Sequence, residues 1–526
     1  MIQLSNNINT NGLTFSAVNP NIYNEFEVTK DAGIFENVVS DLMLNKYSDD
    51  KELTEYILSL PKDKQRMAVL SLIDGDNVLW SKMNTFVNEC DDELAHIKDV
   101  IEIMFQFVKE VEVEKKKFGE VMTPLDLVRD ILRKLPKDVW SNPNLKWLDP
   151  ANGAGTFPLV IIHGLMKGLA DWEPNVGKRY KHIIENMIYT CELQSRNVFL
   201  WLCGVDPKDK YTTNTYWGSF LDNDFDFHMK NVWGVDKFDI VVANPPYNQM
   251  IDMQFLTKSY NLSDKVLFVH PSTWLLDEKC KQSKFINAKK LVGEHLESIE
   301  LFNGNKIFGI SLFMPCVITY IDKFKTISGV YCFDRIKNVE LMYNNIDEIN
   351  KYSNIDVYNS IKNKISNLTI DNIDNHKIFN ISTDRNSTVG KIKKFKHLNT
   401  TNEYYVNIAQ IRGNVYKNDD VKMIQDDFYT IVTKDNKVER KIDNHMFYKF
   451  TSNEEAENFL SYIKTNFSRF CLSVYKNNSQ LECGEMSFIP YLDFNERWDD
   501  NKLFEHFGFT DDEKKFINDN IANYYE

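Results

Sequence analysis

Apolar and polar positions along this chain of 526 residues follow different periods in two long segments. From residue 34 to 116 apolar side chains recur at helical spacing, and Pro61 interrupts this pattern. The run from Val100 to Val108 is an example of the spacing. From Leu145 to Ile321 short apolar, β-branched runs alternate with helical segments. The second pattern predicts a mainly parallel sheet that is covered by helices on both faces.

The alternating segment predicts seven strands and four longer helices. The expected strands are Leu145–Leu148, Met187–Glu192, Thr215–Phe220, Phe238–Ala243, Val266–His270, Ile299–Phe302 and Leu312–Tyr320. The expected helices are Thr156–Leu169, Ser195–Cys203, Met253–Leu262 and Lys281–Leu291. Phe238–Ala243 is the clearest strand, because an almost uninterrupted apolar run is typical of a parallel strand that is buried on both faces.

The pattern changes again after Ser328, where short β-like pieces mix with Asn-rich polar segments. Residues 454–526 become more helical, and Thr510 with Glu513 has the spacing of a capping box before an amphipathic helix. A chain of this length exceeds what one hydrophobic core can hold. We therefore expect a helical region over 1–112, an α/β domain over 113–325 and a mixed α/β region over 326–526.

Composition narrows the class of protein. The hydrophobic fraction of 43% is ordinary for a globular chain, and we find no apolar run that approaches the roughly 20 residues needed to cross a membrane. The eight cysteines form no CxxC pair, which argues against a zinc site or a disulfide framework. We expect a protein of the reducing cytoplasm, with no metal and no membrane partner.

The formal net charge of −14 at first argues against a polyanionic partner. Local charge decides such contacts, however, because one face of a protein makes them. Residues 376–417 carry eight Lys and Arg residues against two Asp and Glu residues, a local charge of +6. A solvated face would give the same pattern, so this stretch alone does not decide the partner.

Candidate catalytic residues follow the strand predicted at Phe238–Ala243. Asn244, Pro245, Pro246 and Tyr247 come directly after it, where the carboxyl ends of strands in open α/β sheets bind ligands. The Asn side-chain oxygen and a carbonyl held by consecutive prolines can accept both hydrogens of one amino group. Tyr247 can stack on the aromatic ring that carries this amino group. This turn is suited to gripping a flat base with an exocyclic amino group.

A second candidate lies at the end of the first strand. Residues 149–157 read Asp-Pro-Ala-Asn-Gly-Ala-Gly-Thr-Phe, and Gly153 and Gly155 allow the backbone to approach a ligand at a helix amino terminus. The segment is neither a GxGxxG fingerprint nor a phosphate-binding P-loop. Glu192 ends the next strand, where an acidic side chain can hold a ribose diol.

Together these segments resemble the S-adenosylmethionine-dependent DNA adenine-N6 methyltransferases. Residues 149–157 are similar to the cofactor loop of that family, residues 244–247 to its N-P-P-Y motif, and residues 118–124 to the segment whose Thr-Pro packs over the cofactor. The order of these segments, with a long region after them, matches the γ arrangement. The resemblance covers residues 113–325 well and extends only loosely to the end of the chain.

The resemblance implies a Rossmann-like methyltransferase sheet of seven strands, preceded by a helical region and followed by a mixed α/β target-recognition domain. It implies S-adenosylmethionine as cofactor and methylation of adenine N6 in double-stranded DNA, with the base flipped out of the duplex. It also leaves open a cognate restriction endonuclease as a partner, and the oligomeric state. A bacterial or phage-infected cell is the expected setting.

The resemblance assigns roles to the residues of this chain that stand at matching positions of the family's motifs. The catalytic candidates are Asn244, Pro245, Pro246 and Tyr247. The cofactor candidates are Thr123, Pro124, Asp149, Ala151, Gly153, Gly155, Glu192 and Phe220. Tyr247 and Phe308 are the candidates for contact with the flipped base, and the DNA-binding candidates are Arg385, Lys391, Lys393, Lys394, Lys396 and Arg412. The chain departs from the family at Ser219, where an Asp is usual, and this weakens the expected cofactor contact there.

Three alternatives stay open. The same turn serves enzymes that methylate protein glutamine or RNA guanine, because it recognises planar amides and amines generally. A combined restriction and modification enzyme is a second alternative, since Glu114-Lys115-Lys116 has the form of a nuclease Glu-x-Lys motif. The third is a DNA-binding protein on a methyltransferase scaffold without catalysis, against which the complete turn at Asn244 argues.

Overall fold

The computed structural model describes residues 34–46, 50–73, 123–206, 210–276, 282–308, 315–350, 352, 355–365, 379–382, 404–409, 429–432, 444–475, 489–490 and 492–521. The chain divides into two compact units. The first comprises residues 1–271, 282–310 and 316–333, and the second comprises 272–281, 311–315 and 334–526. All six DNA-binding candidates, from Arg385 to Arg412, and the Glu114-Lys115-Lys116 segment lie outside the described residues.

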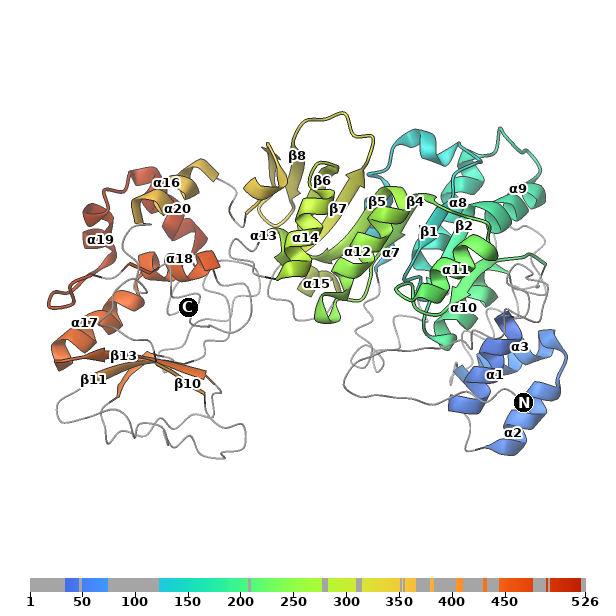
Figure 1. Cartoon of the computed structure of the whole chain (residues 1–526), viewed down its shortest axis with the longest axis horizontal. Helices are drawn as coiled ribbons and strands as arrows, with labels where there is room; N and C mark the ends of the chain where they lie inside the picture. Colours follow the sequence, from blue (N-terminus) through green and yellow to red (C-terminus); the bar gives the residue numbers. More distant parts are fainter. Residues whose placement is uncertain are drawn as a thin grey trace. The chain divides into compact units, whose positions relative to one another are not determined.

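A nine-stranded sheet with the order β3-β2-β1-β4-β5-β7-β6-β8-β9 dominates the fold (Figure 1). Its strands are β1 (Trp147–Asp149), β2 (Ile188–Glu192), β3 (Asn214–Trp217), β4 (Phe238–Ala243), β5 (Ser263–Pro271), β6 (Leu296–Phe302), β7 (Cys316–Asp322), β8 (Val330–Asp334) and β9 (Val339–Tyr343). The strands from β3 to β5 in this order pair in parallel, whereas β7 is antiparallel to both β5 and β6. The predicted α/β class is confirmed.

The sheet has two strands more than the seven that the sequence predicts. In β8 buried residues alternate with partly buried ones, and in β9 partly buried residues alternate with exposed ones, such as Met342, which is 59% exposed. Strands with one exposed face lack the continuous apolar run that marks the buried strands. The sheet therefore continues past residue 325, while the three domain limits expected from the sequence stay predictions.

Helices connect the strands of the sheet. They are α7 (Leu125–Leu132), η2 (Lys137–Trp140), α8 (Thr156–Gly168), α9 (Val176–His182), η3 (Ile183–Met187), α10 (Ser195–Val205), α11 (Asn223–Asn231), η4 (Asn248–Met250), α12 (Ile251–Leu262), α13 (Thr273–Leu276), α14 (Ser283–Val292) and α15 (Gly304–Phe308). The chain reverses direction across the sheet after β3. Since parallel crossovers are right-handed, α8 and α10 cover one face, and α11 and α12 cover the other.

Among the described residues, the helices α1 (Ile34–Lys46), α2 (Lys51–Ser59) and α3 (Lys62–Ile73) come before α7 in the chain. The predicted break is confirmed, because Pro61 stands between α2 and α3. Phe35 of α1 packs on Phe199 of α10, with ring centroids 5.6 Å apart. The rest of the expected helical region, residues 1–33, 47–49 and 74–112, lies outside the described residues.

The second unit contains a four-stranded antiparallel sheet with the order β10-β13-β11-β12. Besides α13 and β9, the described part of this unit contains η5 (Ile346–Glu348), α16 (Ile355–Ile365), β10 (Phe379–Ser382), β11 (Tyr404–Ala409), β12 (Tyr429–Val432), β13 (Asn444–Phe450), α17 (Asn453–Ile463), α18 (Asn466–Tyr475), α19 (Asp500–His506) and α20 (Asp511–Asn520). The predicted capping box at Thr510 and Glu513 is confirmed at the start of α20. No helix in the part of the chain that the structure describes is long and apolar enough to cross a bilayer.

Candidate active site

Three of the predicted segments meet at one edge of the large sheet. Strand β1 pairs in parallel with both β2 and β4, so the carboxyl ends of the three strands lie side by side. Asp149 ends β1, Glu192 ends β2, and Asn244 follows the last residue of β4. The strand order reverses between β1 and β4, and such a switch point is where open α/β sheets bind ligands.

Glu192 joins the end of β2 to the loop after β1. Its Oε2 accepts a hydrogen bond of 2.8 Å from the backbone N–H of Gly153, and its Oε1 accepts one of 2.8 Å from the backbone N–H of Gln194. The bond from Gly153 thus joins the glycine loop after β1 to the acidic end of β2.

Gly155 is required by packing as well as by backbone conformation. Its φ is +97°, in the left-handed region, and a Cβ built there would lie 2.4 Å from Cε3 of Trp201 on α10. The sequence suggested that this glycine admits a ligand. The structure shows that it admits a tryptophan ring, which fixes α10 against the loop. Gly153, with a φ of +54°, is the other left-handed residue of the turn.

Asp149 ends β1 with a buried carboxyl group. Its Oδ1 accepts a hydrogen bond of 3.0 Å from the backbone N–H of Ala151, which is half-buried. Burial raises the pKa of the Asp149 carboxyl to about 8; the nearby Glu192 charge also raises it, and the Ala151 bond opposes the shift. A cationic ligand next to this carboxyl would favour its ionised form.

The side chain of Asn244 is held from both ends. Its Nδ2 donates to Oγ1 of Thr123 at 2.9 Å, and its Oδ1 accepts from the hydroxyl of Tyr247 at 2.5 Å. Thr123 is buried and precedes α7, whose first flanking residue is the half-buried Pro124. Of the two prolines, Pro245 is buried and Pro246 is half-buried. The sequence predicted the residues of this cluster but not the bond between Thr123 and Asn244.

Cys316 is a member of this cluster that sequence reasoning missed. The thiol is buried at the start of β7 and forms a hydrogen bond with the Tyr247 hydroxyl. Burial raises the pKa of Tyr247 well above its ordinary value and that of Cys316 to about 12. Both groups are therefore protonated at neutral pH. No motif marks Cys316, because only the antiparallel pairing of β7 with β5 brings it to this edge.

Phe220, the predicted cofactor-stacking residue, lies in the core between α11 and α12. It is 1% exposed, with ring centroids 5.0 Å from Phe225 and 5.3 Å from Phe255. Next to it, Oγ of Ser219 accepts a hydrogen bond from the backbone N–H of Leu221, so the serine closes its own turn. The contact of Phe220 with the cofactor stays a prediction.

Phe308 ends α15 and is also buried. Its ring packs edge-on against Phe302 at the end of β6, at 5.9 Å between centroids. The sequence gave two readings of this residue, a contact with the flipped base and a core position. The packing is that of a core residue, and the base contact stays a prediction.

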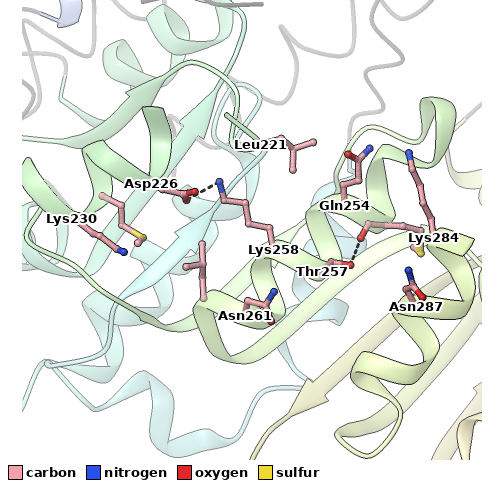
Figure 2. A pocket seen from close by; sticks show the side chains of 12 residues that line it. Leu221, Asp226, Lys230, Gln254, Thr257, Lys258, Asn261, Lys284 and Asn287 are labelled. Atoms are coloured by element: carbon pink, nitrogen blue, oxygen red, sulfur yellow. Dashed lines mark hydrogen bonds and ion pairs between the residues drawn. The ribbon is translucent and has the colours of Figure 1, made fainter. Parts of the chain in front are cut away.

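A groove of about 590 Å³ runs over α11, α12 and α14 beside the turn at Phe220 (Figure 2). It is lined by Leu221, Asp226, Met229, Lys230, Met253, Gln254, Thr257, Lys258, Asn261, Leu262, Lys284 and Asn287. Lys258 lies at its centre and pairs with Asp226 at 2.8 Å. The sequence contained no motif for this groove, because its polar residues come from three separate helices.

The fold and the arrangement of the site agree with the methyltransferase domain that the sequence resembles. Residues 95–288 match the family model for N-6 DNA methylases. The donor set fits the cofactor, since a carboxylate beside a glycine loop can hold ribose hydroxyls and Asp149 can face a cationic group.

Two known proteins place this match in context. An uncharacterized adenine-specific methylase from Mycoplasma pneumoniae is 24% identical over 267 residues, which cover 36% of this chain and 63% of that protein. The chain thus spans less than two thirds of this relative. The methyltransferase subunit of a type I restriction-modification system from Streptococcus thermophilus is 14% identical, with a TM-score of 0.36, over 61% of this chain and 73% of that one.

Proposed function

We propose that this protein methylates the N6 amino group of adenine in double-stranded DNA as part of a restriction-modification system. The observation that carries the proposal is the Asn244 carboxamide, which is held by Thr123 and Tyr247 at the switch point of the sheet. The match to the N-6 DNA methylase family and the adenine-specific relative support adenine as the acceptor.

The residues of the turn act by positioning. Oδ1 of Asn244 and the backbone carbonyl of Pro245 accept the two amino hydrogens of the base, which makes the nitrogen lone pair available in a fixed direction. S-adenosylmethionine, when bound, supplies a methyl group that its sulfonium already activates. Glu192, Asp149 and the loop from Ala151 to Gly155 would hold this cofactor. Because the methyl group is already activated, its transfer to the base would be direct and would need no protein nucleophile.

The amino group of a paired adenine is out of reach inside a duplex, so the base must be flipped at a cost of a few kcal/mol. Stacking on an aromatic ring is worth about 1–3 kcal/mol per base and offsets part of this cost. Tyr247 is half-buried at the turn and is the residue we assign to that contact. The basic stretch over residues 376–417 would hold the phosphates, and a cognate endonuclease would be the second component of the system.

The test is methyl transfer to unmodified duplex DNA, followed by sequencing of the methylated positions. The wild-type protein should place methyl groups on adenine N6 within a defined sequence. Asn244→Ala should lose methyl transfer almost completely while the dissociation constant for the cofactor stays within about two-fold, because the side chain grips the base rather than the cofactor.

The same preparation should be offered ribosomal RNA and a release factor as acceptors. Transfer to either of these in place of DNA would replace the proposed substrate. Substantial activity of purified Asn244→Ala on DNA would contradict the role of the amide, even if adenine proved to be the target.

A further inference from the structure

We infer that Thr123 and the hydroxyl of Tyr247 are positioning residues, which orient the Asn244 carboxamide so that its oxygen faces the amino group of the substrate. The inference rests on the proposed function and extends it to two groups with no assigned part in the methyl transfer. Thr123 was expected to pack over the cofactor, and the ring of Tyr247 was expected to stack on the base, but neither hydroxyl group was given a role.

The Thr123 hydroxyl fixes the nitrogen end of the amide. Thr123 Oγ1 accepts from Asn244 Nδ2 at 2.9 Å, and the two residues are 121 positions apart in the chain. Thr123 is 5% exposed, so water does not readily take its place in this bond.

The Tyr247 hydroxyl fixes the oxygen end. It donates to Asn244 Oδ1 at 2.5 Å and forms a second hydrogen bond with the thiol of Cys316. Because a carboxamide oxygen can accept two hydrogen bonds, an amino hydrogen of the base and the tyrosine can share it. The two bonds together oppose rotation of the amide about its terminal torsion, which is otherwise broad for Asn.

The hydrogen bond between Thr123 and Asn244 also connects the segment expected to bind the methyl donor with the turn expected to bind the acceptor. Thr123 lies in the segment that is expected to cover the cofactor, and Asn244 lies in the turn that is expected to grip the acceptor. A bond between them sets the position of the acceptor amine relative to the methyl donor. Displacements of about 1 Å in such an arrangement can cost about a hundred-fold in rate.

The first experiment compares Thr123→Val with Thr123→Ser. Valine keeps the shape and removes the acceptor, so we expect kcat to fall about ten- to a hundred-fold, in the range of a small misplacement. The KM for DNA and the dissociation constant for S-adenosylmethionine should change less than about two-fold. Serine keeps the hydroxyl and should recover most of the lost kcat. Thermal unfolding of each variant shows that the fold is intact.

The second experiment combines Thr123→Val with Tyr247→Phe, which keeps the ring and removes the hydroxyl. Both bonds act on one carboxamide, so the double variant should lose clearly less than the product of the two single losses. An unchanged kcat in Thr123→Val would overturn the inference. So would a loss confined to cofactor affinity, because Thr123 would then act only by packing on the cofactor.

These outcomes are distinct from a failure of the proposed function. If the wild-type protein methylates RNA or protein instead of DNA, adenine in DNA is excluded as the target. The same variants, measured on the acceptor that is methylated, still decide whether the two hydroxyls position Asn244.

Discussion

Asp149 has a carboxyl group whose burial sets the pH dependence of the folded protein. Its pKa is about 8 in the folded chain, against about 3.9 in an unfolded one. A raised pKa means that the folded state holds the proton more tightly. The stability that this group contributes is therefore fully present below about pH 4 and is lost as the pH rises toward 8, by about 1.4 kcal/mol per unit within that window.

Asp149→Asn should remove this dependence, because the amide is close to the neutral carboxyl in shape and does not ionise. In the absence of cofactor, the variant should match the wild type near pH 4.5 and become progressively more stable than it up to pH 8. Denaturant unfolding of both proteins at several pH values measures the difference. A constant difference across this range would show that the carboxyl is already ionised in the folded protein.

Single residues were predictable where their chemistry belongs to a local pattern. Asn244, Glu192 and Gly153 follow strands that the sequence marks clearly, and the structure brings all three to one edge. The bond between Thr123 and Asn244 was not predictable, since nothing local sets the approach of residues 121 positions apart. Gly155 shows a third case, in which the residue was identified but the neighbour that requires it, Trp201, was not.

At the level of elements, α12 supports the turn that carries Phe220. Lys258 of this helix pairs with Asp226 of α11 at 2.8 Å and donates to the backbone carbonyl of Asp222 at 3.3 Å. Its ammonium group also lies about 5 Å from the ring centroids of Phe220 and Phe225. The side chain is only 18% exposed, so this one cation ties the turn to two helices.

Lys258→Met keeps the aliphatic stem and removes these contacts. If the turn forms a wall of the cofactor site, we expect the dissociation constant for S-adenosylmethionine to rise several-fold, with kcat at saturating cofactor nearly unchanged. Isothermal titration calorimetry measures the first quantity. Lys230→Met, an exposed lysine of the same groove, is the matched control. Equal effects of both substitutions would indicate a general effect of charge.

Elements were predictable from sequence in proportion to their burial. The bounds of β4 were predicted to the residue, because the strand is apolar on both faces. Helix α11 was missed, since only Phe225, His228 and Met229 of its nine residues are buried and they make no strong apolar period. Strands β8 and β9 were missed for the same reason, as each exposes part of one face.

At the level of the whole molecule, a net charge of −14 has to be reconciled with the proposed DNA substrate. Repulsion between the protein and the duplex slows association unless one region presents opposite charge. The stretch over residues 376–417, with a local charge of +6, is the region of the sequence that could do so. Binding to phosphates releases condensed counterions, and the salt dependence of binding therefore reports how many contacts are made.

Replacing Lys393, Lys394 and Lys396 together by Gln should weaken DNA binding and flatten the plot of log Kobs against log salt concentration by roughly 2–3 units, at about 0.9 per phosphate contact. The control replaces Lys137, Lys178 and Lys181, three exposed lysines of the first unit, and changes the net charge by the same amount. A purely global effect of charge would shift both variants alike and leave the slope nearly constant. A change of slope confined to the first variant would assign the DNA phosphates to this stretch, whereas an unchanged slope would show that its lysines face solvent.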